Sequence, residues 1–227
     1  MNPPPGDSES PASRLLRDPA EKERLRTTLK MLPADCSSLL DVGCGSGAFL
    51  RLLRAERAGL RTAGVDRSPS VAAAVTASGA PCLRADSMKL PFADAAFHCA
   101  SALEILEHLE DNALADTARE LSRVASKRIL VSTPHEEELI RLRCAGCGRS
   151  FNPNGHVRRW DERALKALFG KWTLTSSRLI WAEKRPYLYR ELHGFYARIV
   201  RPRLAPAHCL DCAGGDGREN CPPAPPP

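Results

Sequence analysis

The sequence predicts an α/β fold, in which a doubly wound, mostly parallel sheet carries helices on both faces. Three observations support this fold class. Residues 39–50 run from an apolar stretch through an acid and three alternating glycines into an amphipathic segment, the pattern of a strand, a tight turn and a helix. Residues 62–66 form a second apolar stretch that ends in an acid. Strand-like and helix-like segments then alternate as far as residue 169, which is typical of parallel sheets.

Each element is predicted from the spacing of its apolar residues. Short apolar runs indicate strands, and apolar residues three and four positions apart indicate helices, as with Leu114, Ala118, Leu121 and Val124. The expected strands cover 39–42, 62–66, 95–102, 128–133 and 172–180, and the expected helices cover 20–31, 111–125, 161–169 and 186–200.

Length and composition bound the organisation of the chain. A chain of 227 residues can hold one α/β domain with a small appendage, and a hydrophobic content of 43% suits a globular protein. No run approaches the eighteen or so apolar residues of a membrane span, and the proline-rich start lacks a signal peptide's apolar core, so we expect a cytoplasmic protein. The expected organisation is a disordered tail over 1–12, a domain over 13–185 with an insertion over 134–160, a helix and cysteine segment over 186–212, and a disordered tail over 213–227.

The net charge is +6, and arginines cluster in the C-terminal third of the chain. Such clusters belong to ordinary solvated surfaces in many soluble proteins. They also suit contact with an anionic substrate, such as nucleic acid or a sugar phosphate. The charge pattern leaves both interpretations open.

The glycines Gly43, Gly45 and Gly47 indicate a site for a nucleotide-like ligand. Glycine is needed where the backbone takes a positive φ or where a ligand approaches without a Cβ in the way. The pattern Asp-x-Gly-x-Gly-x-Gly, without the lysine of a phosphate-binding loop, resembles the cofactor loop of class I S-adenosylmethionine (SAM)-dependent methyltransferases. The resemblance extends over residues 38–169 and implies a Rossmann-like methyltransferase fold with a seven-stranded-type sheet.

The resemblance implies a role for each acid near this loop. Asp41 would help to hold the ammonium end of SAM, often through water. Asp66, 19 residues after Gly47, would accept hydrogen bonds from the ribose hydroxyls. Asp86 would accept from the adenine amino group with the Ser87 backbone beside it, and an aspartate that caps a turn is the alternative. The candidate cofactor-binding residues are Asp41, Gly43, Cys44, Gly45, Gly47, Asp66, Arg67, Asp86 and Ser87.

The candidate catalytic residues are Glu104, Glu107, His108 and His156. The first three follow the fourth strand, where class I methyltransferases bind substrate, and on a helix their spacing would place them on one face. Similar triplets occur in ubiquinone-pathway O-methyltransferases and in methyltransferases of small-RNA termini, the latter with a downstream histidine such as His156. With a divalent cation these residues would lower the pKa of an acceptor hydroxyl, and without one His108 or His156 would be a general base. The alternative is a solvent-facing helix end, with only His156 contacting the substrate.

The resemblance therefore implies a SAM-dependent methyltransferase that acts on an oxygen atom of a small molecule. One alternative is 2′-O-methylation of RNA 3′ ends, which the low aromatic content of 5% disfavours because bases are bound by stacking. A second alternative is a cofactor-binding protein that is held together by zinc and does not catalyse a reaction. The expected partner is a small-molecule acceptor, which can carry an anionic group. RNA is the less favoured alternative.

The sequence contains two Cys-x-x-Cys pairs. The first lies in a glycine-containing loop, which is typical of a zinc knuckle. Structural zinc takes four ligands, so the two pairs together predict a Cys₄ site that joins the C-terminal segment to a small cysteine-rich insertion after the fifth strand. His156 or His208 could replace a thiolate, and a redox pair or unligated thiols are the alternatives. The candidate zinc ligands are Cys144, Cys147, Cys209 and Cys212.

The other cysteines of the strand-rich region carry no metal-binding pattern. Cys36, Cys82 and Cys99 lie in or beside apolar strands, so we expect them to behave as small buried hydrophobic residues. Cys44 is expected to be a small filler of the glycine turn.

Overall fold

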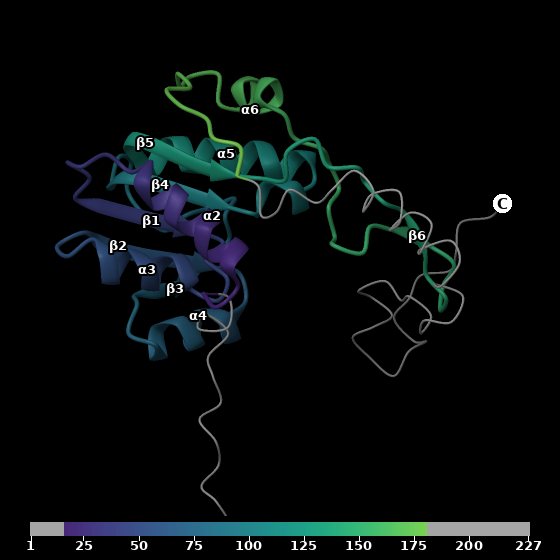
Figure 1. Cartoon of the computed structure of the whole chain (residues 1–227), viewed down its shortest axis with the longest axis horizontal. Helices are drawn as coiled ribbons and strands as arrows, with labels where there is room; N and C mark the ends of the chain where they lie inside the picture. Colours follow the sequence, from purple (N-terminus) through teal and green to yellow (C-terminus); the bar gives the residue numbers. More distant parts are fainter. Residues whose placement is uncertain (1–15, 181–227) are drawn as a thin grey trace, which may run out of the picture. The chain divides into compact units, whose positions relative to one another are not determined.

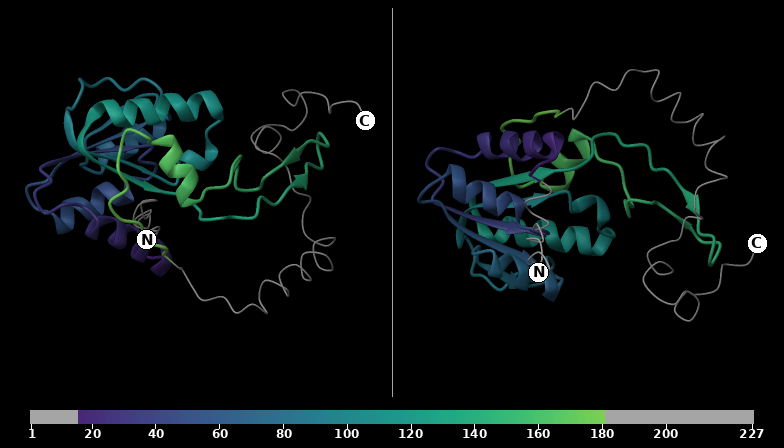
Figure 2. Two further views of the ribbon diagram at one scale, coloured as in Figure 1. Left: turned by 90° about the horizontal axis from the view of Figure 1, so that it is seen from above. Right: turned by 60° about the horizontal axis from the view of Figure 1, so that its bottom comes forward.

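The computed structural model describes residues 16–180, and these belong to two compact units. The sheet unit comprises residues 16–136 and 160–180, and the cysteine unit comprises residues 137–159. Figures 1 and 2 show the sheet unit from three directions, with helices on both faces of a central sheet. The predicted tails, the helix expected over 186–200 and the second cysteine pair lie outside the described residues.

The sheet unit is built around a parallel sheet of five strands. They are β1 (Ser38–Val42), β2 (Arg61–Asp66), β3 (Cys82–Arg84), β4 (Phe97–Leu103) and β5 (Ala125–Ser132). Their order in space is β3-β2-β1-β4-β5, and every neighbouring pair is parallel (Figure 1). The chain builds outward from β1 in one direction and then crosses to β4, which leaves a switch point at the carboxyl ends of these two strands. The predicted doubly wound parallel sheet is confirmed.

In the described part of the chain, five α-helices lie on the two faces of this sheet: α2 (Pro19–Lys30), α3 (Ala48–Glu56), α4 (Pro69–Ala77), α5 (Asp111–Val124) and α6 (Glu162–Leu168). Successive strand residues point to opposite faces. Leu39 of β1 accordingly shares a core cluster with Leu25 of α2 and Phe49 of α3, whereas Leu40 shares one with Leu121 of α5. Within residues 16–180, no helix is long and apolar enough to cross a membrane.

Three predicted strands differ from the structure by more than one residue. The strand expected over 128–133 is β5, which begins three residues earlier, at Ala125. β4 begins at Phe97 rather than at residue 95, because Ala95 has a φ of 54° and lies in a turn. The sixth strand expected over 172–180 is wrong, since the described residues after Trp172 form no strand. Leu174 and Leu179 of this segment are 43% and 60% exposed. A strand needs the backbone of a neighbour to bond with, and β-favouring residues alone do not supply one. The described sheet therefore has five strands.

The cysteine unit contains a short antiparallel hairpin of β6 (Leu142–Arg143) and β7 (Ser150–Phe151). The loop between them starts at Cys144, whose N–H donates to the Arg149 carbonyl at 2.9 Å. The Gly148 N–H donates back to the Cys144 carbonyl at 2.9 Å, and Gly148 has a φ of 72°, which glycine adopts without strain. Cys144 is 2% exposed and packs with Cys147. Both thiols thus belong to one tight turn.

The chain leaves the sheet unit after Glu136 and re-enters it at Trp160. The Glu136 N–H donates to the Trp160 carbonyl at 2.8 Å, and His135 and Trp160 form a parallel bridge. Trp160 is 4% exposed in the core cluster that includes α5. The points of departure and return are therefore hydrogen-bonded to each other beyond the end of β5.

Candidate active site

The glycine turn follows β1 at the carboxyl edge of the sheet. Gly43, Gly45 and Gly47 have φ angles of 70°, 50° and 75°, a region that other residues rarely adopt. A Cβ at Gly43 would overlap the side chain of Ile105, whereas a Cβ at Gly45 would meet no atom within 4 Å. The turn is therefore open at Gly45, where a ligand could approach the backbone closely.

Asp66 ends β2 beside this turn. One carboxylate oxygen accepts the Gly45 N–H at 3.1 Å, and the other accepts the Ser68 N–H at 2.9 Å. Because an ionised carboxylate has about four lone-pair positions, each oxygen keeps an acceptor position beyond its backbone bond. The carboxylate is thus oriented by two backbone donors. Its predicted role toward the ribose stays a prediction.

Asp41 lies within β1 and is 3% exposed. The Ser101 hydroxyl of β4 donates to its carboxylate at 2.6 Å. Burial raises the pKa of Asp41 to about 7, although the Ser101 hydrogen bond and the charge of Arg24 act in the opposite direction. A cation nearby would stabilise the ionised form, and the role predicted for Asp41 toward the ammonium end of the cofactor stays a prediction.

Asp86 and Ser87 follow β3. One Asp86 oxygen accepts the Met88 N–H at 2.9 Å, so this aspartate caps a turn, as the alternative interpretation expects. The Ser87 hydroxyl is hydrogen-bonded to that of Thr117 in α5 at 2.8 Å, which connects the segment to the helix. The adenine contacts of both residues stay a prediction.

Two further candidates differ in their surroundings. Arg67 is exposed directly after β2. The Cys44 thiol lies 3.4 Å from the Cys82 thiol and beside Gly64 of β2. Its side chain also shares a core cluster with Leu50 of α3 and Val75 of α4, and its backbone is the part that belongs to the glycine turn.

Glu104 lies outside the short helical turn that carries the next two candidates, η1 (Leu106–His108), so no helix places all three on one face. The Ser132 hydroxyl donates to the Glu104 carboxylate at 2.7 Å, and the Arg24 guanidinium of α2 lies 3.8 Å away. Glu104 has a φ of 54°. Such strain in a non-glycine residue gathers at functional sites. The network connects α2 to the ends of β4 and β5, and the catalytic role of Glu104 stays a prediction.

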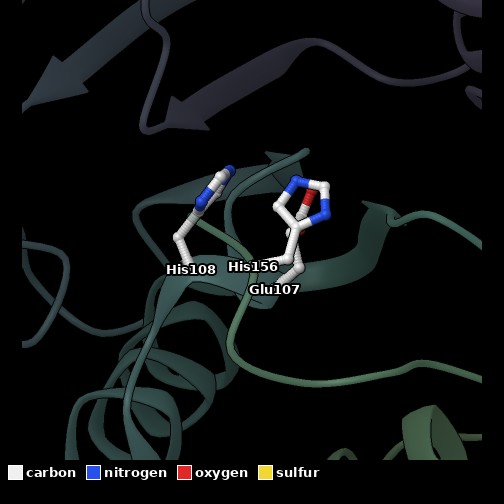
Figure 3. Close-up of side chains that lie close together, drawn as sticks. All are labelled: Glu107, His108 and His156. Carbon is white, nitrogen blue, oxygen red and sulfur yellow. The ribbon is translucent and has the colours of Figure 1, made fainter. Parts of the chain in front are cut away.

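Glu107 and His108 are neighbours on η1, and Figure 3 draws their side chains. Glu107 is 1% exposed, whereas His108 is exposed. A carboxylate and an imidazole are ligand types for divalent cations, and each can also transfer a proton. Glu107 and His108 are therefore suited to both chemistries predicted for this segment, the binding of a divalent cation and the transfer of a proton.

His156, the third side chain drawn in Figure 3, belongs to the cysteine unit. The Glu137 carboxylate is hydrogen-bonded to its Nδ1. Asn152 accepts the His156 backbone N–H at 3.3 Å, and the Asn152 amide donates to the Ile140 carbonyl at 3.2 Å. A carboxylate on Nδ1 sets the ring orientation and the tautomer, which gives a base or ligand role to Nε2. Because His156 and the η1 residues belong to different units, their predicted convergence stays a prediction.

Three residues in these contacts escape prediction from the sequence. Ser101 is a polar residue within an apolar strand, which is a weak signal for a buried partner. Glu137 is the centre of a run of three glutamates after β5, and the run does not reveal which one meets a histidine. Arg24 carries no distinguishing signal, because its contact with Glu104 depends on how α2 packs on the sheet.

Comparison with known proteins places this site in a family. A family model described as a methyltransferase domain matches residues 13–174. The methyltransferase in a complex with the Haloferax volcanii Trm112 methyltransferase activator is 21% identical, covers 70% of this chain and 72% of that chain, and has a TM-score of 0.52. A Pyrococcus horikoshii protein is 21% identical, covers 66% of this chain and 79% of that chain, and has a TM-score of 0.52.

A Thermotoga maritima protein described as a SAM-dependent methyltransferase and possible histamine N-methyltransferase is 19% identical, covers 70% of this chain and 72% of that chain, and has a TM-score of 0.50. At these identities the likeness shows the fold alone. A comparison with curated proteins gives no match. The family match spans more than half of the chain and includes the glycine turn, Asp41 and Asp66. The chain therefore belongs to the methyltransferase domain family, and it shares the fold of the SAM-dependent methyltransferase among these solved structures.

Proposed function

We propose that this methyltransferase acts on an oxygen atom of a small-molecule acceptor. The observation that carries the proposal is the Glu137–His156 pair, because a histidine oriented by a carboxylate is suited to be a general base. A hydroxyl has to lose its proton as its oxygen attacks the methyl group, and imidazole accepts protons near neutral pH. The resemblance of the Glu-x-x-Glu-His segment to O-methyltransferases supports the same acceptor atom.

The residues around the glycine turn would hold and orient the cofactor. When bound, SAM supplies a methyl group carried on a sulfonium sulfur, and the neutral thioether left after methyl transfer is a good leaving group. Asp41 would face the ammonium end, Asp66 the ribose hydroxyls, and Asp86 with Ser87 the adenine. The remaining task of the chain is to align the acceptor oxygen with the methyl group and to exclude water.

His156 would take up the acceptor's proton at Nε2, and Glu137 would stabilise the imidazolium that forms. The chain re-enters the buried core at Trp160, four residues after His156. Glu107 and His108 support a second route, in which a divalent cation bound by carboxylate and imidazole would lower the pKa of the acceptor hydroxyl. The two routes make different predictions for chelation, because only the second needs a metal.

Replacing His156 by alanine is expected to lower turnover by about 10²- to 10⁴-fold, the usual contribution of a general base, while SAM affinity is unchanged. The measurement incubates the protein with methyl-labelled SAM and a small-molecule extract, identifies the product by its mass shift, and then compares rates between variants. His135→Ala removes an exposed imidazole of the sheet unit and serves as the matched control.

A normal rate in His156→Ala would overturn the base role. Loss of turnover on chelation, and in Glu107→Gln, would then favour the cation route. Label recovered in RNA rather than in small molecules would overturn the proposed acceptor and favour ribose methylation, which the exposed Arg141 and Arg143 of the cysteine unit would support.

We also propose a structural zinc ion at the Cys144–Cys147 turn. A buried thiol, a second thiol three positions later and a positive-φ glycine directly after it fit the knuckle that presents two thiolates to zinc. Cys209 and Cys212, outside the described residues, would complete a Cys₄ site. The zinc would stabilise the fold and take no part in methyl transfer.

Purified protein is expected to contain about one zinc ion per chain, because structural zinc sites hold their metal tightly. Elemental analysis measures this content. Cys144→Ser and Cys209→Ser should each remove most of the zinc, whereas Cys36→Ser, which changes a buried thiol of the sheet unit, should retain it. A zinc content below about a tenth of an equivalent in the unaltered protein would refute the site.

A further inference from the structure

Two pairs of thiols meet in the sheet unit. The Cys44 and Cys82 sulfur atoms lie 3.4 Å apart, and the Cys36 and Cys99 sulfur atoms lie 2.9 Å apart. The members of each pair are 38 and 63 residues apart in the sequence, so only the fold brings them together. The two pairs differ in their exposure to solvent and in their distance along the chain from the glycine turn.

The first pair meets across β2, the strand that lies between β1 and β3. Gly64 of β2 is in register with Cys82 of β3, and a Cβ at Gly64 would lie 2.8 Å from the Cys44 sulfur. Any larger residue at position 64 would displace this thiol. The absence of a side chain therefore lets a residue that follows β1 and a residue that begins β3 touch each other over β2.

The two thiol pairs differ in how accessible they are to oxidants. Cys36 and Cys99 are 7% and 1% exposed. Cys44 is 8% exposed, but Cys82 is half-buried and reaches solvent at the β3 edge of the described sheet. Because Cys82 is the more exposed of the two, we expect the oxidant to react with it first. Burial raises the pKa of both Cys44 and Cys82, so their reaction is slower than that of exposed thiols.

We propose that Cys44 and Cys82 form a reversible disulfide that weakens SAM binding. With hydrogen peroxide as oxidant, the Cys82 sulfur attacks one peroxide oxygen and becomes a sulfenic acid while water leaves. The Cys44 sulfur then displaces the hydroxyl from this sulfenic acid, which forms the S–S bond and releases a second water. Overall, two thiols and one peroxide give one disulfide and two waters, and an added thiol reverses the change.

The effect on the cofactor follows from geometry, and this step rests on the proposed cofactor site. A disulfide requires a sulfur–sulfur distance of about 2.05 Å, so the two sulfurs must approach by more than about 1 Å. Cys44 stands between Gly43 and Gly45, and the Gly45 N–H is bonded to Asp66. Moving Cys44 toward β3 therefore moves the backbone that would contact SAM. A misplacement of about 1 Å can cost up to about a hundredfold in a preorganised site.

The experiment treats the full-length protein with hydrogen peroxide, maps disulfides by tryptic digestion and mass spectrometry, and measures SAM affinity by calorimetry. A Cys44–Cys82 bond would join the peptides 31–51 and 68–84, whereas a Cys36–Cys99 bond would join 31–51 and 90–119. We expect the first cross-link, SAM binding at least about tenfold weaker, and recovery of both on reduction. Joining of only the second pair of peptides would overturn the proposal.

Cys82→Ser and Cys99→Ser separate the redox effect from general damage. Cys82→Ser should bind SAM normally when reduced and keep that affinity after peroxide, and Cys82→Ala provides a second variant if the serine destabilises β3. Cys99→Ser should remain as sensitive to peroxide as the unaltered protein. Equal loss of affinity in Cys82→Ser and the unaltered protein would refute the disulfide. Absence of SAM binding by the reduced protein would instead refute the cofactor site.

Discussion

Replacing Asp66 by alanine is expected to weaken SAM binding by at least about tenfold, because two hydrogen bonds to the ribose hydroxyls would be lost and hydrogen bonds to charged groups are worth about 1.5–3 kcal/mol each. The change also removes the acceptor of the Gly45 and Ser68 N–H groups, which leaves the glycine turn less well held. Calorimetric titration of the protein with SAM measures the dissociation constant.

Asp35→Ala is the matched control for this experiment. Asp35 is an exposed aspartate whose described partner is Lys127, at 3.2 Å, and its removal should leave SAM affinity unchanged. A second comparison uses Ser68→Pro, which deletes one backbone donor to Asp66 and keeps the carboxylate. It should weaken SAM binding less than Asp66→Ala does. Equal affinity of Asp66→Ala and the unaltered protein would exclude the ribose role.

Replacing Asp41 by asparagine is expected to stabilise the cofactor-free protein above pH 7 and to weaken SAM binding. The pKa of Asp41 is raised by burial from 3.8 to about 7 in the folded state. Between these values the folded protein holds a proton that the unfolded chain has released, so the free energy of unfolding falls as pH rises from about 4 to 7 and is constant above. The cost of the buried charge reaches on the order of 4 kcal/mol, and asparagine does not incur it.

Thermal and denaturant unfolding at several pH values measure this difference. We expect Asp41→Asn to be more stable than the unaltered protein at pH 8 and to lose that advantage near pH 4, where both side chains are neutral. SAM affinity of the unaltered protein should fall as pH drops below 7, since protonation removes the charge that would face the ammonium group. A SAM affinity independent of pH in that range would contradict the predicted role of Asp41.

Ser101→Ala provides the control for the Asp41 experiment. The Ser101 hydroxyl donates to the carboxylate and so favours its ionised form. Its loss should raise the pKa of Asp41 further and shift the pH dependence of SAM binding to higher pH. A general packing defect would lower stability without moving the pH midpoint, so the two explanations are separable.

Much of the fold and the cofactor loop can be predicted from the sequence because the signals are local. An apolar run that ends in an acid and leads into alternating glycines predicts β1, its turn and α3 from their own backbone preferences. The four apolar residues of the helix over 111–125 likewise lie buried in α5. Local patterns failed where the element depends on its neighbours: residues 172–180 have strand-forming composition but no partner strand among the described residues.

By itself, the sequence determined four of the five strands of the sheet, their parallel arrangement and the glycine turn, since each depends on conformational preferences and apolar spacing within a few residues. It did not predict the short strand β3 or the helix α4. Only the tertiary structure decided that Asp66 accepts the Gly45 N–H, that Glu104 lies in a network with α2 instead of on a helix with Glu107, and that the Cys44 thiol meets Cys82. The Gly45–Asp66, Arg24–Glu104 and Cys44–Cys82 contacts each join residues that are 21 or more positions apart. No local pattern encodes them, because they arise when whole elements pack.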